Sequence, residues 1–146
     1  RGMRAMQKER VDSTVCNCLA LRQAARHITQ IYDIYLASEG LRTTQYSILA
    51  KLSRLGPLSI NELAKSMIMD RTTLGRAIQP LERDRLLTIG AGGDGRTRSL
   101  RLTAKGETRV KAAATKWREA QDQFEASFGV RDSAQLRSVL QRVAAI

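Results

Sequence analysis

Two helix starts lie close together in the middle of the chain, and they constrain the fold more than any other feature. In LSINEL, Ser59 and Glu62 have the S-x-x-E spacing in which each side chain accepts a hydrogen bond from the other residue's free backbone N–H. This capping box predicts a helix that begins at Ile60. In MDRTTL, Asp70 is placed to cap a second helix, which leaves room only for a short turn. Two short capped helices joined by a tight turn predict a helix-turn-helix.

The second of these helices is predicted to have one apolar and one polar face. At 100° per residue, an apolar stripe is formed by Leu74, Ala77, Ile78 and Leu81. The opposite face carries Thr72, Arg76, Gln79 and Arg83. Hydroxyl, guanidinium and amide groups are those that contact base edges and phosphates in DNA complexes. A polar outer face is often merely solvated, but the capped turn before it and an arginine-rich loop after it favour nucleic-acid binding. Pro80 cannot donate to the carbonyl of Arg76, so we expect a kink there and not a clean end.

A β-hairpin is predicted after this helix. The run Leu86-Leu87-Thr88-Ile89 is typical of a short strand, and Leu100 and Leu102 mark the inward side of a returning strand. The glycine-rich stretch AGGDGRTR between them allows a long hairpin tip. A helix-turn-helix followed by such a hairpin predicts a wing, and Thr103 is placed to cap the helix that follows it.

The wing carries the residues that give the loop its basic character. We expect Arg96, at the tip, to enter a minor groove, where narrow A·T-rich DNA concentrates negative potential. Arg98 and Arg101 are expected to hold phosphates. Asp94 is better explained as an acceptor within the loop that pre-orients Arg96, because a carboxylate that faces phosphate is repelled.

The charge balance favours a polyanionic partner. The chain has 25 Lys and Arg against 14 Asp and Glu, a formal net charge of +11, and residues 51–106 hold eleven of the basic and five of the acidic side chains. No apolar run approaches the roughly 20 residues of a membrane-spanning helix, so we expect a cytoplasmic protein with no membrane partner. The single histidine, His27, has no nucleophile arranged around it, and with Cys16 and Cys18 it cannot complete a zinc site. The sequence therefore predicts no enzyme, no metal and no cofactor.

Long apolar stripes flank the central region. From residue 11 to 35 apolar side chains recur in steps of three and four, which predicts one long helix stopped by Gly40, and Thr43 is placed to cap the helix after it. A second stripe from Val110 to Phe128 ends at Gly129, and a last helix is expected to open at Asp132, with Gln135 as its capping partner. So many apolar faces favour a homodimer over an intramolecular bundle.

The predicted fold is therefore mainly α with a small β-hairpin wing. Residues 1–40 are expected to form an N-terminal dimerisation helix. Residues 41–106 would form a winged helix-turn-helix DNA-binding domain. Residues 107–146 would add C-terminal dimerisation helices.

Four segments resemble the MarR family of winged-helix transcription regulators in order and spacing: LRTTQYSILAKL, GPLSINELAKSM, MDRTTLGRAIQPLERDRLL and DGRTRSLRLTAKG. The resemblance implies a homodimer that recognises a palindromic operator, acts as a repressor, and is released by a small effector or by thiol oxidation. It also implies DNA contacts at Thr72, Thr73, Arg76, Asp94 and Arg96. Two positions depart from the family pattern. Gly75 stands where a hydrogen-bonding residue is common, and Arg85 stands where glycine is common.

The resemblance further places an effector pocket between the dimer helices and the winged domain, which indicates His27, Tyr32 and Tyr46. The alternatives are a dimer-face role for the histidine and a core role for the tyrosines. Cys16 and Cys18, two positions apart on a predicted helix, would point about 200° from each other and could not bond to one another. Cys16 is nevertheless a candidate redox residue, because it could meet a partner chain's thiol. The alternative is that both cysteines fill the core. An architectural protein that binds nucleic acid without sequence preference remains the other class.

Overall fold

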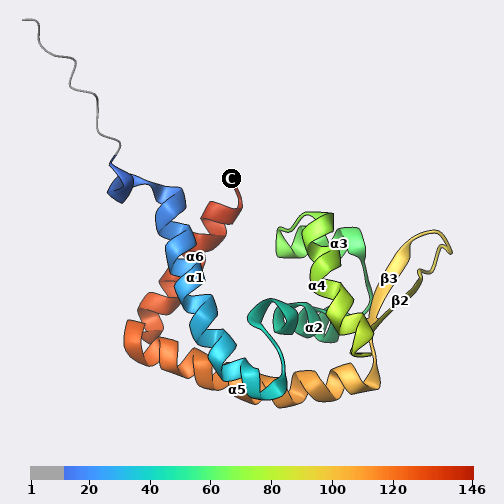
Figure 1. Cartoon of the computed structure of the whole chain (residues 1–146). Coiled ribbons are helices and arrows are strands. Elements are labelled where there is room, and N and C mark those ends of the chain that lie inside the picture. The colour runs from blue at the N-terminus through green and yellow to red at the C-terminus, as the bar shows by residue number, and fades with distance from the viewer. Residues whose placement is uncertain (1–11) are drawn as a thin grey trace, which may run out of the picture.

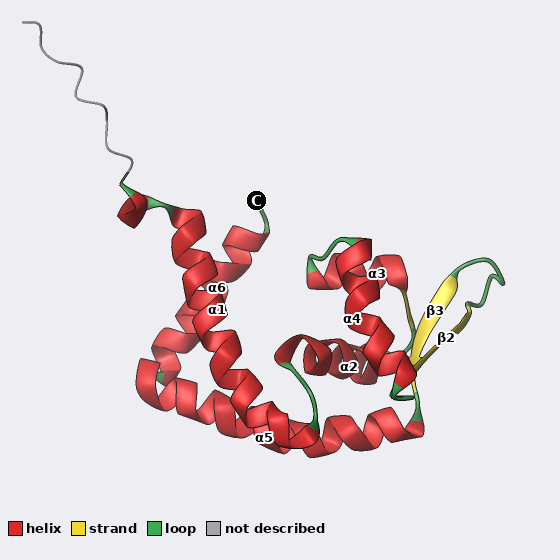
Figure 2. Ribbon diagram, in the orientation of Figure 1, coloured by secondary structure: helices red, strands yellow, loops and turns green. Residues whose placement is uncertain are grey.

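A computed structural model of the chain describes residues 12–146, which form six α-helices and three short strands (Figure 1, Figure 2). The elements follow in the order α1 (Asn17–Leu36), α2 (Thr43–Leu55), β1 (Leu58–Ser59), α3 (Ile60–Met67), α4 (Arg71–Arg83), β2 (Leu87–Ala91), β3 (Arg98–Leu102), α5 (Ala104–Phe128) and α6 (Val130–Ala144). Single turns of 3-10 helix, Ser13–Val15 and Ala37–Glu39, stand on either side of α1. The mainly α architecture with a small wing confirms the predicted fold class.

The elements gather into two parts that share one helix. Residues 41–106, called the winged head below, hold α2, α3, α4 and the sheet, and lie on one side of the molecule (Figure 1). The helices α1, α5 and α6, called the helical arm, lie on the other side. Helix α5 starts at the root of the wing, runs beneath α2 and continues to the corner where α6 begins. A rigid helix of 25 residues therefore connects the wing directly to the arm.

The sheet has one strand more than the sequence predicted. Its order is β1-β3-β2, with both pairs antiparallel. Leu87 faces Leu102 and Ala91 faces Arg98 in the wing hairpin, while Leu58 faces Leu100 across the other edge of β3. Because β1 leads directly into α3, this extra pair ties the wing to the helix-turn-helix.

The core lies in the winged head, where α2, α3, α4 and the sheet meet. Its fully buried side chains include Ile48, Leu49, Leu63, Leu74 and Leu100. The apolar stripe predicted for α4 supplies three buried members, Leu74, Ile78 and Leu81, and the partly buried Ala77 completes it. Helix α4 runs through Pro80 to Arg83 without ending, as predicted.

Two predicted helix starts in the first half of the chain are wrong. Helix α1 begins at Asn17 and not near residue 11, because Cys16 has extended backbone (φ −78°, ψ 109°) and Asp12 caps a separate 3-10 turn through Thr14. Val11, at the start of the predicted stripe, lies outside the described residues. Thr43 is the first residue of α2 and does not cap it. Its backbone N–H and its hydroxyl both donate to the Asp33 carboxylate of α1, each at 2.7 Å.

The last helix also starts earlier than predicted. Helix α6 begins at Val130, directly after Gly129, whose φ of 103° turns the chain sharply out of α5. Asp132 is therefore inside the first turn and makes no cap. Ser133, buried at this corner, donates its hydroxyl to the Gly129 carbonyl at 2.6 Å. The Asp132-x-x-Gln135 spacing suggested a capping pair, but the glycine's backbone conformation determines where the helix begins.

Candidate nucleic-acid interface

Both predicted caps of the helix-turn-helix are present. The Ser59 hydroxyl accepts the Glu62 N–H at 3.1 Å, and the Glu62 carboxylate accepts the Ser59 N–H at 2.9 Å, which confirms the capping box and the start of α3 at Ile60. Asp70 accepts both the N–H and the hydroxyl of Thr73 at 2.7 Å. These bonds, the backbone one first, hold the pKa of Asp70 below its ordinary value. The first turn of α4 is thus fixed before any ligand binds.

The exposed face of α4 carries the polar groups predicted from the helical wheel. Exposed side chains on this helix include Thr72, Thr73, Arg76, Gln79 and Arg83. Two of them are partly engaged within the chain: the Thr73 hydroxyl donates to Asp70, and Arg83 Nε lies 3.9 Å from the Asp84 carboxylate. Arg76 and Gln79 project from the middle of the helix, next to the hydroxyl of Thr72. The face presents hydrogen-bonding groups of the kinds that recognise base edges.

The tip of the wing is organised around Asp94. Its carboxylate accepts the Arg96 N–H at 3.0 Å, the Thr97 N–H at 2.9 Å and the Thr97 hydroxyl at 2.8 Å. The two Thr97 bonds, followed by the Arg96 bond, lower the pKa of Asp94. Gly92 lies so close to the opposite arm of the loop that a Cβ there would be 2.7 Å from the Thr97 carbonyl oxygen. Asp94 holds the backbone of Arg96, while the exposed guanidinium is left to solvent.

The three wing arginines do not form one row. Arg96 and Arg98 line the same small hollow of about 370 Å³ beside β2. Arg101 lies three residues after Arg98 on β3, so it projects from the opposite face of the strand. All three are exposed. A single phosphate could be approached by Arg96 and Arg98 together, but Arg101 would need a different one.

The turn after α4 is clamped against the start of α5. Arg85 has φ +60°, so a residue with a side chain makes the left-handed turn for which the family pattern has glycine. Its carbonyl accepts the Thr103 hydroxyl at 2.6 Å, and Lys105 Nζ donates to the Asp84 carbonyl at 3.0 Å. Thr103 also caps α5 as predicted, accepting the Gly106 N–H at 2.9 Å. These bonds therefore tie the wing root, the end of α4 and the start of α5 together.

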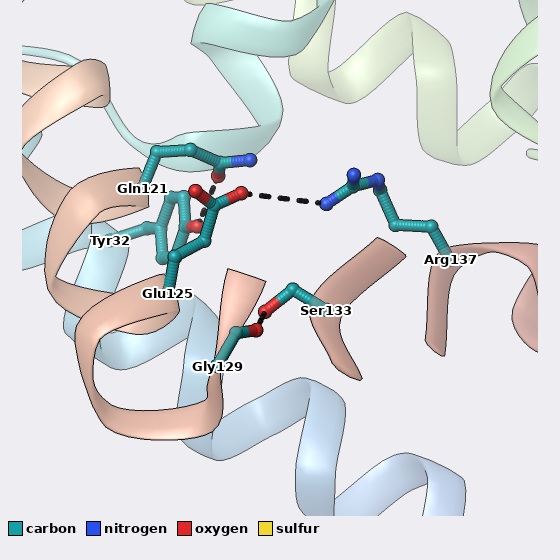
Figure 3. Close-up of polar contacts among 6 residues, drawn as sticks. All are labelled: Tyr32, Gln121, Glu125, Gly129, Ser133 and Arg137. Atoms are coloured by element: carbon teal, nitrogen blue, oxygen red, sulfur yellow. Dashed lines mark hydrogen bonds and ion pairs between the residues drawn. The ribbon is translucent and has the colours of Figure 1, made fainter. Parts of the chain in front are cut away.

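An apolar groove of about 850 Å³ lies in the helical arm, between α1, α5 and α6. Its walls are mostly aliphatic and include Leu21, Ile28, Leu136, Leu140 and Val143. A polar cluster stands at one end (Figure 3): the Tyr32 hydroxyl donates to the Gln121 amide oxygen, and Arg137 lies 3.7 Å from Glu125. Burial, and then the negative charge of Glu125, raise the pKa of Tyr32.

The structure does not bring the three proposed effector residues together. Tyr32 lines the groove, whereas His27 is exposed on α1 outside its lining. Tyr46 is buried in the core of the winged head, where its ring stacks on Trp117 of α5 at a centroid distance of 6.3 Å. Sequence reasoning missed Gln121, which accepts the hydrogen bond from the Tyr32 hydroxyl. Gln121 is one helical turn after Trp117 on α5, so this bond lies next to the stacking contact between Trp117 and Tyr46.

The cysteines differ from the core-filling interpretation. Cys16 and Cys18 are both exposed, so neither fills the core of the chain. Cys16 precedes α1 and caps it, its Sγ accepting the Leu19 N–H at 3.3 Å. The argument from helix geometry that these two side chains point 200° apart is therefore wrong, because only Cys18 is in the helix.

The caps, the exposed face of α4 and the wing define a winged helix-turn-helix, the class of fold that inserts a helix into the DNA groove. A model of the MarR family matches residues 41–88. The chain is 36% identical to the M. tuberculosis transcriptional regulator MosR, whose structure with DNA it matches over 89% of this chain and 97% of that one, with a TM-score of 0.77. It is 29% identical over 104 residues to the Bacillus subtilis HTH-type transcriptional regulator YxaD, covering 70% of this chain and 73% of the relative. BpsR of Bordetella bronchiseptica shares the fold at 17% identity, with a TM-score of 0.82 over 92% of this chain and 97% of its own.

The chain belongs to the MarR family and is a DNA-binding transcriptional regulator of that type. The family is not one of enzymes. Within residues 12–146, no helix combines the length and the apolar character that crossing a bilayer requires.

Proposed function

We propose that the protein is a homodimeric repressor that recognises a palindromic operator and is released from it by a small effector. The observation that carries this proposal is the exposed polar face of α4, held in place by caps at its start and by the wing root at its end. Thr72, Arg76 and Gln79 would contact base edges in the major groove. Thr73 would contact phosphate by turning its hydroxyl from Asp70 to a phosphate oxygen, since the hydroxyl has a single proton to donate. Arg83, near the end of the helix, would contact phosphate as well.

The wing would extend this footprint into the flanking DNA. Arg96 is the tip residue with a free guanidinium on a backbone fixed by Asp94, so it would enter the minor groove without a large ordering cost. Arg98 and Arg101, on opposite faces of β3, would bind phosphates on the two sides of that groove.

The groove of the helical arm supports the dimer. Apolar side chains exposed in and around it include Leu21, Val139, Leu140 and Val143, each at least 38% exposed in the single chain. We infer that a second copy of the chain covers this surface, since an apolar surface of this kind on a single chain indicates an interface. The arms (residues 1–40 and 107–146) would then form the dimer interface, and the two winged heads (residues 41–106) would bind half-sites about one helical turn apart.

An effector would act where the arm meets the winged head. Tyr32 of α1 and Tyr46 of α2 approach successive turns of α5, at Gln121 and Trp117. A small molecule inserted at this junction would change the angle between α5 and the head, and with it the separation of the two α4 helices. The regulation of BpsR by 6-hydroxynicotinic acid is a precedent in the same fold. His27 remains a weaker candidate at the exposed side of α1.

A thiol-based switch is a second candidate mechanism, favoured by the exposure of both cysteines at the start of the arm. Cys16 caps α1, so oxidation of its sulfur by peroxide would change the size and charge of the group that accepts the Leu19 N–H. If peroxide leaves operator affinity unchanged in the wild type and in Cys16→Ser alike, this mechanism fails.

Selection of binding sites from a random duplex pool tests the main proposal. The expected result is one palindromic motif, with Arg76→Ala relaxing the preference at a single position of each half-site. Arg54→Ala, which removes an exposed arginine at the end of α2 to which the proposal assigns no contact, is the matched control and should leave the motif unchanged. Recovery of no motif, with uniform binding to all duplexes, would support the architectural class instead. A reporter driven by a promoter carrying the motif would then separate repression from activation.

A further inference from the structure

Two turns bound helix α4, and both have an unusual backbone. Among residues 12–146, the only residues other than glycine with positive φ are Ile68, at φ 52° before α4, and Arg85, at φ 60° after it. Ile68 ends α3 in the left-handed conformation, with its N–H directed to the carbonyls of Ala64 and Lys65. The next residue, Met69, donates its N–H to the Ala64 carbonyl at 2.9 Å. These bonds are those of a helix end at which the left-handed position is usually glycine.

Isoleucine is an energetically unfavourable residue at this position. In the left-handed region the Cβ atom approaches the following carbonyl, and a β-branched side chain makes the crowding worse. Glycine would make the same hydrogen bonds without that strain. The geometry of the turn therefore does not explain why this residue is isoleucine.

Burial within the chain does not explain the isoleucine side chain either. The Ile68 side chain is 73% exposed, so it contributes little to the core. Arg85 differs in this respect, because its guanidinium is solvated in water and needs no apolar partner. Ile68 combines an unfavourable backbone conformation with an apolar side chain exposed to solvent, and strain of this kind concentrates at functional sites.

The position of Ile68 identifies the partner. Only Met69, Asp70 and Arg71 separate it from Thr72, the first exposed polar residue of α4. Four residues span at most about 14 Å, the length of about four base pairs. A duplex contacted by Thr72 therefore passes near Ile68, close enough for a contact that the variants below can test.

We propose that Ile68 is a DNA contact that packs its side chain against an apolar surface of the operator, within about four base pairs of the base at Thr72. The apolar groups that DNA offers there are the thymine C5 methyl group and the C–H surface of deoxyribose. The proposal rests on operator binding by α4. It adds a side chain outside α4 to the residues that determine affinity, and, if a thymine methyl is the partner, sequence preference.

Two variants test it on the selected duplex. Ile68→Gly removes both the side chain and the strain, whereas Ile68→Ala removes most of the side chain and keeps a Cβ in the left-handed turn. We expect both variants to bind about three- to tenfold more weakly by fluorescence anisotropy, since each loses a partly buried aliphatic group. The two variants should differ in stability, because only the glycine variant relieves the strain. In urea unfolding the glycine variant should have a higher midpoint than the alanine variant. Leu55→Ala is the matched control. It removes an apolar side chain that is 50% exposed at the end of α2, outside both the proposed dimer interface and the proposed DNA contacts, and its affinity should equal that of the wild type.

Uracil in place of each thymine in turn identifies the partner group. If one uracil weakens the wild type but not Ile68→Ala, the contact is a thymine methyl, and if none does while both variants bind weakly, the contact is deoxyribose. Unchanged affinity in both variants would overturn the proposal. Weak binding by the glycine variant alone would overturn it too, because turn flexibility would then be the cause. A wild type that prefers no duplex would instead refute operator recognition itself.

Discussion

Replacing Gly106 by alanine should destabilise the protein although the residue lies in a helix. A Cβ at this position of α5 would be 2.0 Å from the Leu86 carbonyl oxygen, where ordinary contact begins near 3.4 Å, so α5 would have to retreat from the wing root by more than 1 Å. That movement would break two bonds of the root, Thr103 N–H to Leu86 at 3.1 Å and Thr103 hydroxyl to Arg85 at 2.6 Å. Each is worth about 1 kcal/mol. Overpacking against backbone adds about 1–3 kcal/mol, while the better helix propensity of alanine returns about 1 kcal/mol. The net loss in the free energy of unfolding is about 2–4 kcal/mol.

Gly75→Ala is the matched control, because it makes the same change inside α4 with no heavy atom within 4 Å of the new Cβ. It should stabilise the protein by about 1 kcal/mol. Urea unfolding followed by circular dichroism, at one protein concentration for all variants, measures both effects. With an m-value of about 2 kcal/mol/M, the midpoint should fall by about 1–2 M for Gly106→Ala and rise by about 0.5 M for Gly75→Ala. If Gly106→Ala is as stable as Gly75→Ala, the close contact between α5 and the wing root is wrong.

The remaining predictions concern recognition, pH and assembly. Arg76→Ala should lose about 1–3 kcal/mol of binding free energy on the selected operator and relax the base specificity. Arg96→Ala should weaken binding to cognate and scrambled duplexes alike and lower the salt slope of the affinity by about one. Equal effects of both variants on both duplexes would contradict this division of roles. The hydrogen bonds from Thr97 and Arg96 lower the pKa of the Asp94 carboxylate. The carboxylate should therefore stabilise the wing tip fully above its ordinary pKa of 3.8, and this stabilisation should be lost as the pH falls through the lower folded-state pKa. An NMR titration of the Thr97 amide with a midpoint at or above 3.8 would refute this prediction. If the proposed dimer forms through the groove, Leu140→Asp should convert it to monomers in sedimentation velocity, because the substitution places a charge among the apolar side chains of the groove. A dimer unchanged at micromolar concentration would count against the groove as the interface.

Features encoded by neighbouring residues could be predicted from the sequence. The Ser59 and Glu62 capping box and the Asp70 cap join residues three positions apart, so their spacing alone predicts the bonds that form. The polar face of α4 follows in the same way from the 3.6-residue repeat. The candidate DNA-contact surface could therefore be assembled before the fold was known.

Features that depend on distant residues could not be predicted. The Asp33 carboxylate that holds the start of α2 comes from α1, and nothing near Thr43 in the sequence indicates it. Strand β1 is two residues long and has no period of its own, so only its pairing with β3 reveals it. The groove of the arm depends on how α1 and α6 sit against α5, which a single helical wheel does not show. The exposed, left-handed Ile68 was overlooked because a β-branched residue is not expected in that conformation.

Affinity measured against salt concentration, on the selected duplex and on a scrambled duplex of the same composition, tests the central claim most directly. An operator-recognising regulator should keep a preference of at least about a thousandfold at physiological salt, because its base contacts do not depend on counterion release. Equal affinities that fall together with the same steep salt slope would mean that the arginines bind only phosphate, and would contradict the account.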